Sequence, residues 1–396
     1  MTAQRIAKWT IWVFVLVFGL AACGKKEAAT QGVGGETIVK IGSAAPLTGP
    51  QAQLGKDNDN GARLAIEETN EAGVVLGGKK VKFVLVSEDD QADPKTATIV
   101  AHKLVDAQVK GVIGHLNSGA SIPASKIYAE AGIPQISPSA TAIAYTAQGF
   151  KTAFRVMTND RQQGKVLGEY AVKKLGAKKV AIIDDRTAYG QGLADEVEAA
   201  AKASGGNVVA REYTSDKSTD FNAILTVIKG KQPDVVFYAG MYPQGVPMVK
   251  QMRSLGLKAT FMGGDGVQTS DFVSLAAADA EGVVASSPGL PLESMPGGKA
   301  FKDKFNAKYG VIQNYAPYAY DAAQTMVEAM KKADSAEPVK YLAELPRIQR
   351  VGVTGNIRFD ERGDIRGGAI TLYKVKNGKW EVLETILGDA GAVEKK

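Results

Sequence analysis

Cysteine and histidine are scarce in this sequence of 396 residues, which contains one cysteine and two histidines. Because Cys23 is the only cysteine, the chain forms no intramolecular disulfide and offers no cysteine-based metal site. His102 falls within a predicted helix, where we expect a surface or boundary residue. His115 follows a predicted strand, where we expect a structural role, with contact to the binding site as the alternative. Two histidines so placed assemble neither a histidine-rich metal site nor a histidine-based catalytic triad. We therefore predict no bound metal and no catalytic residues.

Nucleotide-binding loops are also missing. No GxGxxG motif follows a predicted strand with an acidic residue about 20 positions further on. The stretch "GPQAQLG" (49–55) is not a phosphate-binding loop, because no Gly-Lys-Ser/Thr follows it. Acidic pairs such as Asp184-Asp185 do occur, but carboxylates at strand ends commonly cap helices or form ion pairs. We expect no cofactor, and these absences argue against an enzyme.

Charge of one sign does not accumulate along the chain. The formal net charge is +6, and Lys, Arg, Asp and Glu are interspersed. Without a basic stripe, we expect no nucleic-acid partner. The composition is 45% hydrophobic and 23% charged, which is typical of a globular protein, and the length suffices for two domains.

The N-terminus carries the features of an export signal. Arg5 and Lys8 precede the apolar run "TIWVFVLVFGLAA", which is shorter than the ~20 residues that span a bilayer. The run ends in "LAAC", which resembles a bacterial lipobox with Cys23 as the lipid-bearing residue. We predict a lipoprotein signal peptide over 1–22 and a flexible tether over 23–36, rich in small and polar residues. A plain signal peptide with a chance cysteine is the alternative.

Beyond the tether, strands alternate with helices, which predicts βαβ units and parallel sheets covered on both faces. The predicted strands are 37–47, 80–90, 109–114 and 132–138, and the helices between them are 61–73, 93–108 and 121–131. The same order recurs in 178–213 and 221–266. Two further segments predict a helix over 314–333 and antiparallel strands with a turn at Lys376-Asn377-Gly378 within 355–383. We infer two similar doubly wound domains.

In open α/β sheets, ligands bind outside the carboxyl ends of the strands. The segments that follow the predicted strands are rich in Gly, Ser, Thr, Asn, Tyr or Asp, namely 46–55, 114–121, 137–141, 184–192, 240–245 and 263–269. Ser118 begins a predicted helix, whose free N–H groups and dipole favour an anion. Asp265 stands between glycines, where its carboxylate can face a cation. An anion site on one domain and a carboxylate on the other match a zwitterion such as an amino acid, although each residue alone also fits a cap or a turn.

These residues resemble a known family. The stretches "KIGSAAPLTGPQAQLG", "GVIGHLNSGASIPASKIYAEAGIPQISPSATA", "AYGQGLAD" and "GGDGV" are similar to the periplasmic leucine/isoleucine/valine-binding proteins, which serve branched-chain amino acid ABC importers. The resemblance covers the chain from about Thr37. It implies a type I periplasmic binding protein fold, with two Rossmann-like lobes joined by a hinge of three crossovers. We expect lobe 1 to comprise 37–159 and 289–365, and lobe 2 to comprise 160–288 and 366–392.

The resemblance also implies roles for individual residues. Ser118 and Thr141 would bind the ligand carboxylate, Ser139 would offer its carbonyl to the ammonium, and Asp265 would pair with that ammonium. Tyr189 would reach across from lobe 2 when the cleft closes. The wall of the side-chain pocket would consist of Leu54, Met241 and Tyr242.

The sequence departs from the best-known members in the pocket. Asp265 stands where they carry Glu, and Leu54 and Met241 stand where they often carry Tyr. Ala92 and Asn117 occupy places where some members have a disulfide pair. The pocket residues therefore leave the ligand open between a branched-chain amino acid, another amino acid and a different small carboxylate.

We expect a lipid-anchored, extracytoplasmic solute-binding protein, monomeric, that delivers an amino acid to the membrane permease of an ABC importer. A ligand sensor of the same fold is the alternative, and an exported enzyme is a third. A cytosolic repressor shares the architecture, but it needs an N-terminal helix-turn-helix where this chain has a signal and tether.

Overall fold

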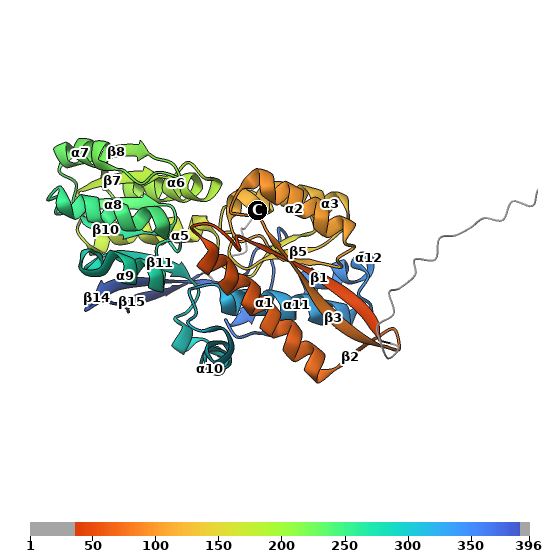
Figure 1. Ribbon diagram of the computed structural model, residues 1–396. Helices are drawn as coiled ribbons and strands as arrows, with labels where there is room; N and C mark the ends of the chain where they lie inside the picture. Colours follow the sequence, from red (N-terminus) through yellow and green to blue (C-terminus); the bar gives the residue numbers. More distant parts are fainter. Residues whose placement is uncertain (1–35, 389–396) are drawn as a thin grey trace, which may run out of the picture.

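The computed structural model describes residues 36–388, and the predicted signal peptide and most of the predicted tether lie outside the described residues. Two sheets with helices on their faces lie side by side (Figure 1). The first sheet has the strand order β2-β3-β1-β4-β5-β6, and the second has the order β15-β14-β11-β10-β9-β7-β8. This arrangement is the predicted doubly wound α/β architecture in two lobes.

The strands of the first sheet are β1 (Thr37–Ala45), β2 (Val74–Leu76), β3 (Lys79–Asp89), β4 (Val112–Gly114), β5 (Gln135–Ser137) and β6 (Ala153–Arg155). Those of the second are β7 (Lys179–Asp184), β8 (Asn207–Tyr213), β9 (Val235–Ala239), β10 (Thr260–Gly263), β11 (Val284–Pro288), β14 (Ala369–Lys376) and β15 (Lys379–Leu387). A separate short ladder pairs β12 (Arg350–Val351) with β13 (Asn356–Ile357).

The helices before the second sheet are α1 (Ala52–Ala72), α2 (Pro94–Asp106), α3 (Ser118–Glu130), α4 (Ala144–Ala147) and α5 (Asp160–Glu169). Those that follow are α6 (Ala188–Ala203), α7 (Asn222–Lys231), α8 (Tyr242–Ser254), α9 (Ser270–Ala276), α10 (Gly298–Tyr309), α11 (Ala316–Lys332) and α12 (Pro338–Tyr341). No helix among the described residues is long and apolar enough to cross a membrane.

Parallel pairing places the carboxyl ends of neighbouring strands at the same edge of each sheet. In the first sheet β1 pairs in parallel with β3 and β4, and β5 pairs in parallel with β4 and β6. In the second sheet β7, β8, β9, β10 and β11 are likewise parallel. Because the carboxyl ends of parallel strands meet at one edge, the loops after them form one surface on each lobe.

Local sequence signals explain several element boundaries. Asp93 caps α2 by accepting a hydrogen bond from the N–H of Thr96 at 2.7 Å, and Pro94 occupies the first turn, as the sequence predicts. The turn between β14 and β15 contains Asn377 and Gly378 with φ of 51° and 69°, the left-handed conformations of a tight hairpin.

One predicted boundary is wrong. The helix expected over 61–73 begins at Ala52, so Leu54 lies in its first turn and not in a loop after a strand. The sequence "QLGKDNDNGAR" lacks a continuous apolar stripe, and its polar residues Asp57, Asn58 and Asp59 are nevertheless buried. Packing against other elements makes this polar stretch helical, and the intrinsic helix propensities of its residues do not reflect that packing.

The chain passes between the sheets three times. It leaves the first sheet after β6, enters lobe 2 through α5, and returns after β11 to α10 and α11, which pack with α1 on lobe 1. It then crosses again after β13 to form β14 and β15 (Figure 1). The C-terminal strands therefore complete the sheet of lobe 2, although they are far from β7 in sequence.

Helices α1 and α11 lie side by side and approach closely at Gly61. A Cβ atom at Gly61 would lie 2.2 Å from the carbonyl oxygen of Ala316, so a larger residue would push the helices apart. Gly192 of α6, which is half-buried, has open space around the same position.

We predict that Gly61→Ala lowers the free energy of unfolding by about 1–3 kcal/mol, because the new methyl overpacks a helix crossing. The control Gly192→Ala should raise it by about 1 kcal/mol through helix propensity. Urea unfolding followed by circular dichroism measures both. Equal stability changes in the two variants would contradict the close crossing.

Candidate functional site

The loops at the strand ends of the two lobes enclose a small cavity of about 20 Å³. Five of the eight residues predicted from the sequence line it, and three residues that were not predicted complete the lining. The predicted ones are Ser118, Ser139, Tyr189, Met241 and Asp265, and the others are Leu116, Asn117 and Tyr315. The wall contains loop and helix residues of both lobes, so the cavity lies between the lobes.

Asp265 is the centre of the polar network at this cavity. Its Oδ1 accepts hydrogen bonds from the Tyr189 hydroxyl at 2.8 Å and from the Gln163 amide at 2.9 Å. Its Oδ2 accepts one from the Tyr315 hydroxyl at 2.7 Å. Among the described residues, no cationic side chain lies within ion-pair distance of this buried carboxylate. Burial raises the pKa of Asp265, and the three donors oppose that rise.

The two phenols remain protonated donors in this network. Burial, followed by the nearby Asp265 carboxylate, raises the pKa of Tyr189 and of Tyr315 well above the usual value. Tyr189 lies on the lobe of Asp265, so its hydrogen bond stays within lobe 2. Tyr315 precedes α11 of lobe 1, so its hydrogen bond joins the lobes directly.

Tyr315 is the principal site residue that the sequence did not reveal. It is the second residue of the predicted helix 314–333, where an aromatic residue is unremarkable, and it directly precedes α11. Its position is set by Asp57 of α1, whose carboxylate accepts hydrogen bonds from the backbone N–H groups of Gln313, Asn314, Tyr315 and Ala316 at 2.7–3.1 Å. This cap from another helix fixes the start of α11 and thereby aims Tyr315 at Asp265.

The hydroxyl-rich segment after β5 is held by side chains from neighbouring strand ends. The Ser137 hydroxyl accepts the N–H of Ala140 at 2.9 Å and donates to the His115 carbonyl at 2.9 Å, so Ser137 shapes the turn. The Ser139 hydroxyl donates to the Leu116 carbonyl at 3.1 Å. The Ser118 hydroxyl accepts the N–H of Ala142 at 3.1 Å, which draws the start of α3 against this segment.

Thr141, Leu54 and Tyr242 do not line the small cavity. The Thr141 hydroxyl is buried and has no hydrogen-bond partner among the described residues. Leu54 is fully buried in the hydrophobic core. The Tyr242 hydroxyl donates to the Pro50 carbonyl at 3.1 Å and forms a second direct contact between the lobes.

A wider cleft of about 380 Å³ adjoins the small cavity and shares Asn117, Ser118, Tyr189 and Met241 with it. The N-terminal ends of α3 and α6 both line this cleft, through Gly119 and Ala188 among others. Helix N-termini carry partial positive charge, which favours an anionic group, and the side chains of Asp185, Arg186 and Asp216 also line this cleft.

The two histidines lie where the sequence predicted. His102 is exposed on α2. His115 is fully buried, and its ring nitrogens lie 2.7 Å from Asp90 Oδ2 and 3.0 Å from the Tyr128 hydroxyl. His115, Asp90 and Tyr128 line neither the small cavity nor the adjoining cleft. The His115 side chain therefore supports the end of β4 and does not contact a ligand.

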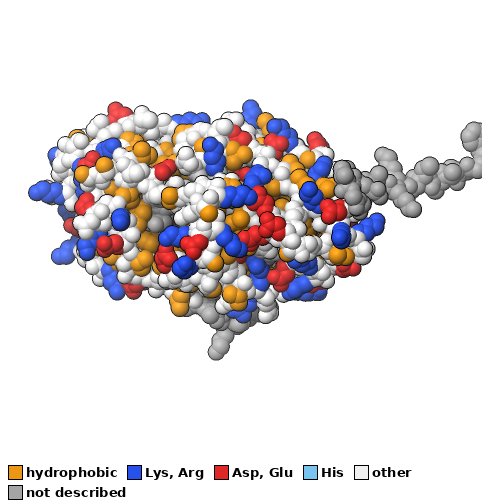
Figure 2. Space-filling view, turned by 60° about the horizontal axis from the view of Figure 1, so that its bottom comes forward, with side chains coloured by type: hydrophobic (Ala, Val, Ile, Leu, Met, Phe, Trp, Pro, Cys, Tyr) orange, Lys and Arg blue, Asp and Glu red, His pale blue; other side chains and the backbone are white. Residues whose placement is uncertain are grey.

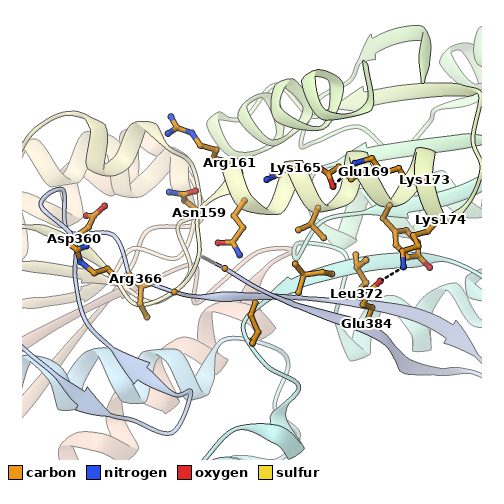
Figure 3. A pocket seen from close by; sticks show the side chains of 18 residues that line it. Asn159, Arg161, Lys165, Glu169, Lys173, Lys174, Asp360, Arg366, Leu372 and Glu384 are labelled. Atoms are coloured by element: carbon orange, nitrogen blue, oxygen red, sulfur yellow. Dashed lines mark ion pairs between the residues drawn. The ribbon is translucent and has the colours of Figure 1, made fainter. Parts of the chain in front are cut away.

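A larger cavity lies elsewhere. It is a groove of about 650 Å³ between α5 and the β14–β15 pair (Figure 3). Lys173 pairs with Glu169 at 3.2 Å and Lys174 pairs with Glu384 at 3.6 Å, and all four side chains are substantially exposed. In these solvent-exposed ion pairs, each charge is already neutralised by its partner, so the groove presents no unpaired charge from these four residues. The strand-end cleft is the better candidate site, because buried polar groups of both lobes converge there.

Acidic and basic side chains alternate over the face in Figure 2, without a patch of one sign. This distribution agrees with the interspersed charges of the sequence. It offers no broad charged surface on that face.

Known proteins share this architecture. The family described as "Periplasmic binding protein" matches residues 38–379. The chain belongs to this family. The family assignment and the fold predicted from the sequence are thereby confirmed.

Individual relatives are similar over nearly the whole family domain. A Leu/Ile/Val-binding protein homolog 1 of Brucella abortus is 37% identical over 346 residues, covering 86% of this chain and 91% of the relative. A leucine-, isoleucine-, valine-, threonine- and alanine-binding protein of Pseudomonas aeruginosa is 36% identical, with 85% and 89% covered.

Among solved structures, the branched-chain amino acid transporter substrate binding protein LivJ of Streptococcus pneumoniae, in complex with isoleucine, is 32% identical. Its TM-score is 0.80, with 89% of this chain and 100% of that chain covered. Members of this family bind substrates for transporters outside the cytoplasm, so we place this periplasmic binding protein on the extracytoplasmic side of the membrane.

Asp160 adds a second buried carboxylate behind Asp265. The Gln163 amide donates to Asp160 Oδ1 at 3.2 Å and to Asp265 Oδ1 at 2.9 Å, so one amide bridges the two acids. Asp160 Oδ2 has no hydrogen-bond partner among the described residues. Burial, followed by the charge of Asp265, raises the pKa of Asp160 to about 8.

We predict that Asp160→Asn flattens the dependence of stability on pH. The unfolded chain ionises Asp160 near its usual pKa of about 3.9, whereas the folded protein keeps the proton until pH is about 8. The unfolded state then binds fewer protons between these values, so stability falls as pH rises. Thermal unfolding of the wild type from pH 5 to 8 should show a falling midpoint, and the variant should show a shallower fall.

The matched control is Asp234→Asn. Asp234 is exposed, and hydrogen bonding from the backbone of Lys179 lowers its pKa, so its ionisation is complete throughout this range. Its curve should run parallel to that of the wild type. A parallel curve for Asp160→Asn would show that Asp160 holds no proton in the folded protein.

Proposed function

We propose that this protein captures a branched-chain or related aliphatic amino acid in the cleft between its lobes and delivers it to an ABC importer. The observation that carries this proposal is the Asp265 carboxylate, buried at the cleft without a cationic partner among the described residues. A buried carboxylate is stabilised by an ion pair, and the ammonium of an amino acid provides the missing cation. The names of the relatives, which include leucine, isoleucine and valine, agree with this ligand class.

The remaining head-group contacts follow from the strand-end residues. Ser118 and Thr141 bind the ligand carboxylate. Ser118 begins α3, and its hydroxyl accepts the N–H of Ala142, the residue after Thr141. The unpartnered hydroxyl of Thr141 gains a hydrogen bond in this complex. Ser139 offers its carbonyl to the ammonium, opposite Asp265.

Lobe movement supplies the binding mechanism. The cavity of about 20 Å³ holds little more than one water molecule, so an amino acid enters only when the lobes separate. Separation breaks the Tyr315–Asp265 and Tyr242–Pro50 hydrogen bonds. A ligand that touches both lobes then favours a closed state shaped around it. Tyr189 reaches the ligand from lobe 2 in this state.

We assign the crossovers of this movement to 159/160, 288/289 and 365/366. Each junction lies between the last strand of one sheet and the next element of the other: β6 ends at Arg155, β11 ends at Pro288, and β14 begins at Ala369. Lobe 1 then comprises 37–159 and 289–365, and lobe 2 comprises 160–288 and 366–388. The predicted end of lobe 2, 389–392, lies outside the described residues.

Side-chain selectivity is assigned to the apolar residues around the head-group site. Met241 lines the cavity directly, while Leu54 and Tyr242 stand behind it. Met and Leu present no polar atom that needs a donor from the ligand, which suits an aliphatic side chain. A sensor of the same fold shares every one of these features, and a neighbouring permease gene would distinguish transport from sensing. Enzymatic turnover of an amino acid or amide would instead favour the enzyme alternative.

Calorimetric titration of ligand-stripped protein with the twenty amino acids, small amides and aromatic acids should detect binding of leucine, isoleucine or valine. We predict that Asp265→Asn weakens that binding at least 100-fold, about 3 kcal/mol, because the ammonium loses its buried partner. Asp279→Asn, a carboxylate of lobe 2 outside the site, should bind like the wild type. Binding by none of the amino acids would refute the assignment, and full affinity of Asp265→Asn would refute its role.

The lipid anchor is tested separately. We propose that Cys23 carries the lipid and that the protein acts as a monomer at the membrane. Cys23→Ser should release the protein from the membrane fraction, because the thiol is the site of lipid attachment. Immunoblotting of membrane and soluble fractions measures the distribution. A variant that stays with the membrane as the wild type does would count against the anchor.

A further inference from the structure

Arg155 lies at the end of β6 and is completely buried, which is unusual for a charged side chain. Its guanidinium donates through Nη1 to the Ala140 carbonyl at 2.8 Å and through Nη2 to the Ala142 carbonyl at 3.0 Å. These two carbonyls flank Thr141 on either side. One planar group therefore holds the backbone before and after the residue to which we assign carboxylate binding.

The same guanidinium is tied to the hinge. Its Nε donates to Asp364 Oδ1 at 2.5 Å, and Asp364 Oδ2 accepts from the Asn159 amide at 3.1 Å. Asn159 precedes α5 on the first crossover, and Asp364 lies just before the last one. The Thr146 hydroxyl closes the cluster by donating to Asp364 at 2.8 Å and accepting from Arg155 at 2.8 Å.

This geometry requires an arginine. A guanidinium presents five N–H donors in a rigid fork, and here Nε, Nη1 and Nη2 each donate to a different group. A lysine ammonium is a single point of donation and reaches fewer of these acceptors at once. In Arg155→Lys, at least one of the buried Ala140 and Ala142 carbonyls would lose its hydrogen-bond donor. The backbone around Thr141 would therefore shift.

Thr141 is held through its backbone, and its side chain faces the carboxyl group of Asp160. Its carbonyl accepts the N–H of Asp160 at 2.9 Å, while its hydroxyl has no partner among the described residues. The orientation of that hydroxyl therefore depends on the backbone that Arg155 fixes.

We infer that Arg155 and Asp364 are positioning residues that hold Thr141 in place for the ligand carboxylate and connect this contact to the hinge. The inference rests on the proposed function, since it assumes that a carboxylate binds at Thr141. The donors of Arg155 are engaged with Asp364 and with the carbonyls on either side of Thr141, so both residues act through the backbone of Thr141.

A double-mutant cycle tests the inference. Leucine affinity is measured by calorimetry for the wild type, Arg155→Lys, Thr141→Val and the double variant. We expect Arg155→Lys to weaken binding roughly 10- to 100-fold in the wild type but less than about 3-fold in the Thr141→Val background. A role in general stability would lower affinity by the same factor in both backgrounds, and that result would overturn the inference.

The matched control is Arg350→Lys in the same cycle. Arg350 pairs with the buried Asp321 of lobe 1 at 3.3 Å, away from the cleft, so its effect should not depend on Thr141. If Arg155→Lys does not fold, Asp364→Asn takes its place and should show the same dependence on Thr141 with a smaller loss. Equal losses of Asp364→Asn in both backgrounds overturn the inference. A wild type that binds no amino acid refutes the proposed function itself.

Discussion

The rest of the site depends on one constraint, which is that a carboxylate is kept at the closed interface between two lobes. Asp265 is buried, and neutral donors from two tyrosines and a glutamine surround it. Neutral donors lessen the desolvation penalty but do not cancel the charge. Two features follow from this. Gln163 shares its amide with Asp160, whose pKa rises, and Tyr315 joins the lobes through the same carboxylate.

The architecture supplies what this constraint needs. Parallel strands deliver short polar loops from each sheet to a common edge, and the three chain passages hold the two edges opposite each other. Polar side chains from distant segments then fix these loops: Asp57 holds the start of α11, and Arg155 holds the segment around Thr141. At the cleft the lobes are connected by directional hydrogen bonds, including those from Tyr315 to Asp265 and from Tyr242 to Pro50, which break and reform when the lobes move.

Sequence patterns predicted the alternation of strands and helices, the two-lobed fold and five of the residues around the small cavity. They succeeded because the strand ends concentrate Gly, Ser, Thr and Asp in loops of parallel sheets. They missed the start of α1, because buried Asp57 and Asn58 obscure its apolar periodicity. They also missed Tyr315 and Gln163, which reach Asp265 from segments 50 and 102 positions away. No local pattern encodes such contacts.

The hydrogen bond from Tyr242 to Pro50 has a kinetic consequence. It joins the lobes beside the cavity without lining it. Since a ligand enclosed between the lobes leaves only after they part, such latching contacts set how long the ligand stays, independently of how well it fits. Residence time and binding of the amino-acid head group are therefore carried by different residues. Evolution can adjust the delivery rate of this protein at the rim of its cleft while its head-group site stays the same.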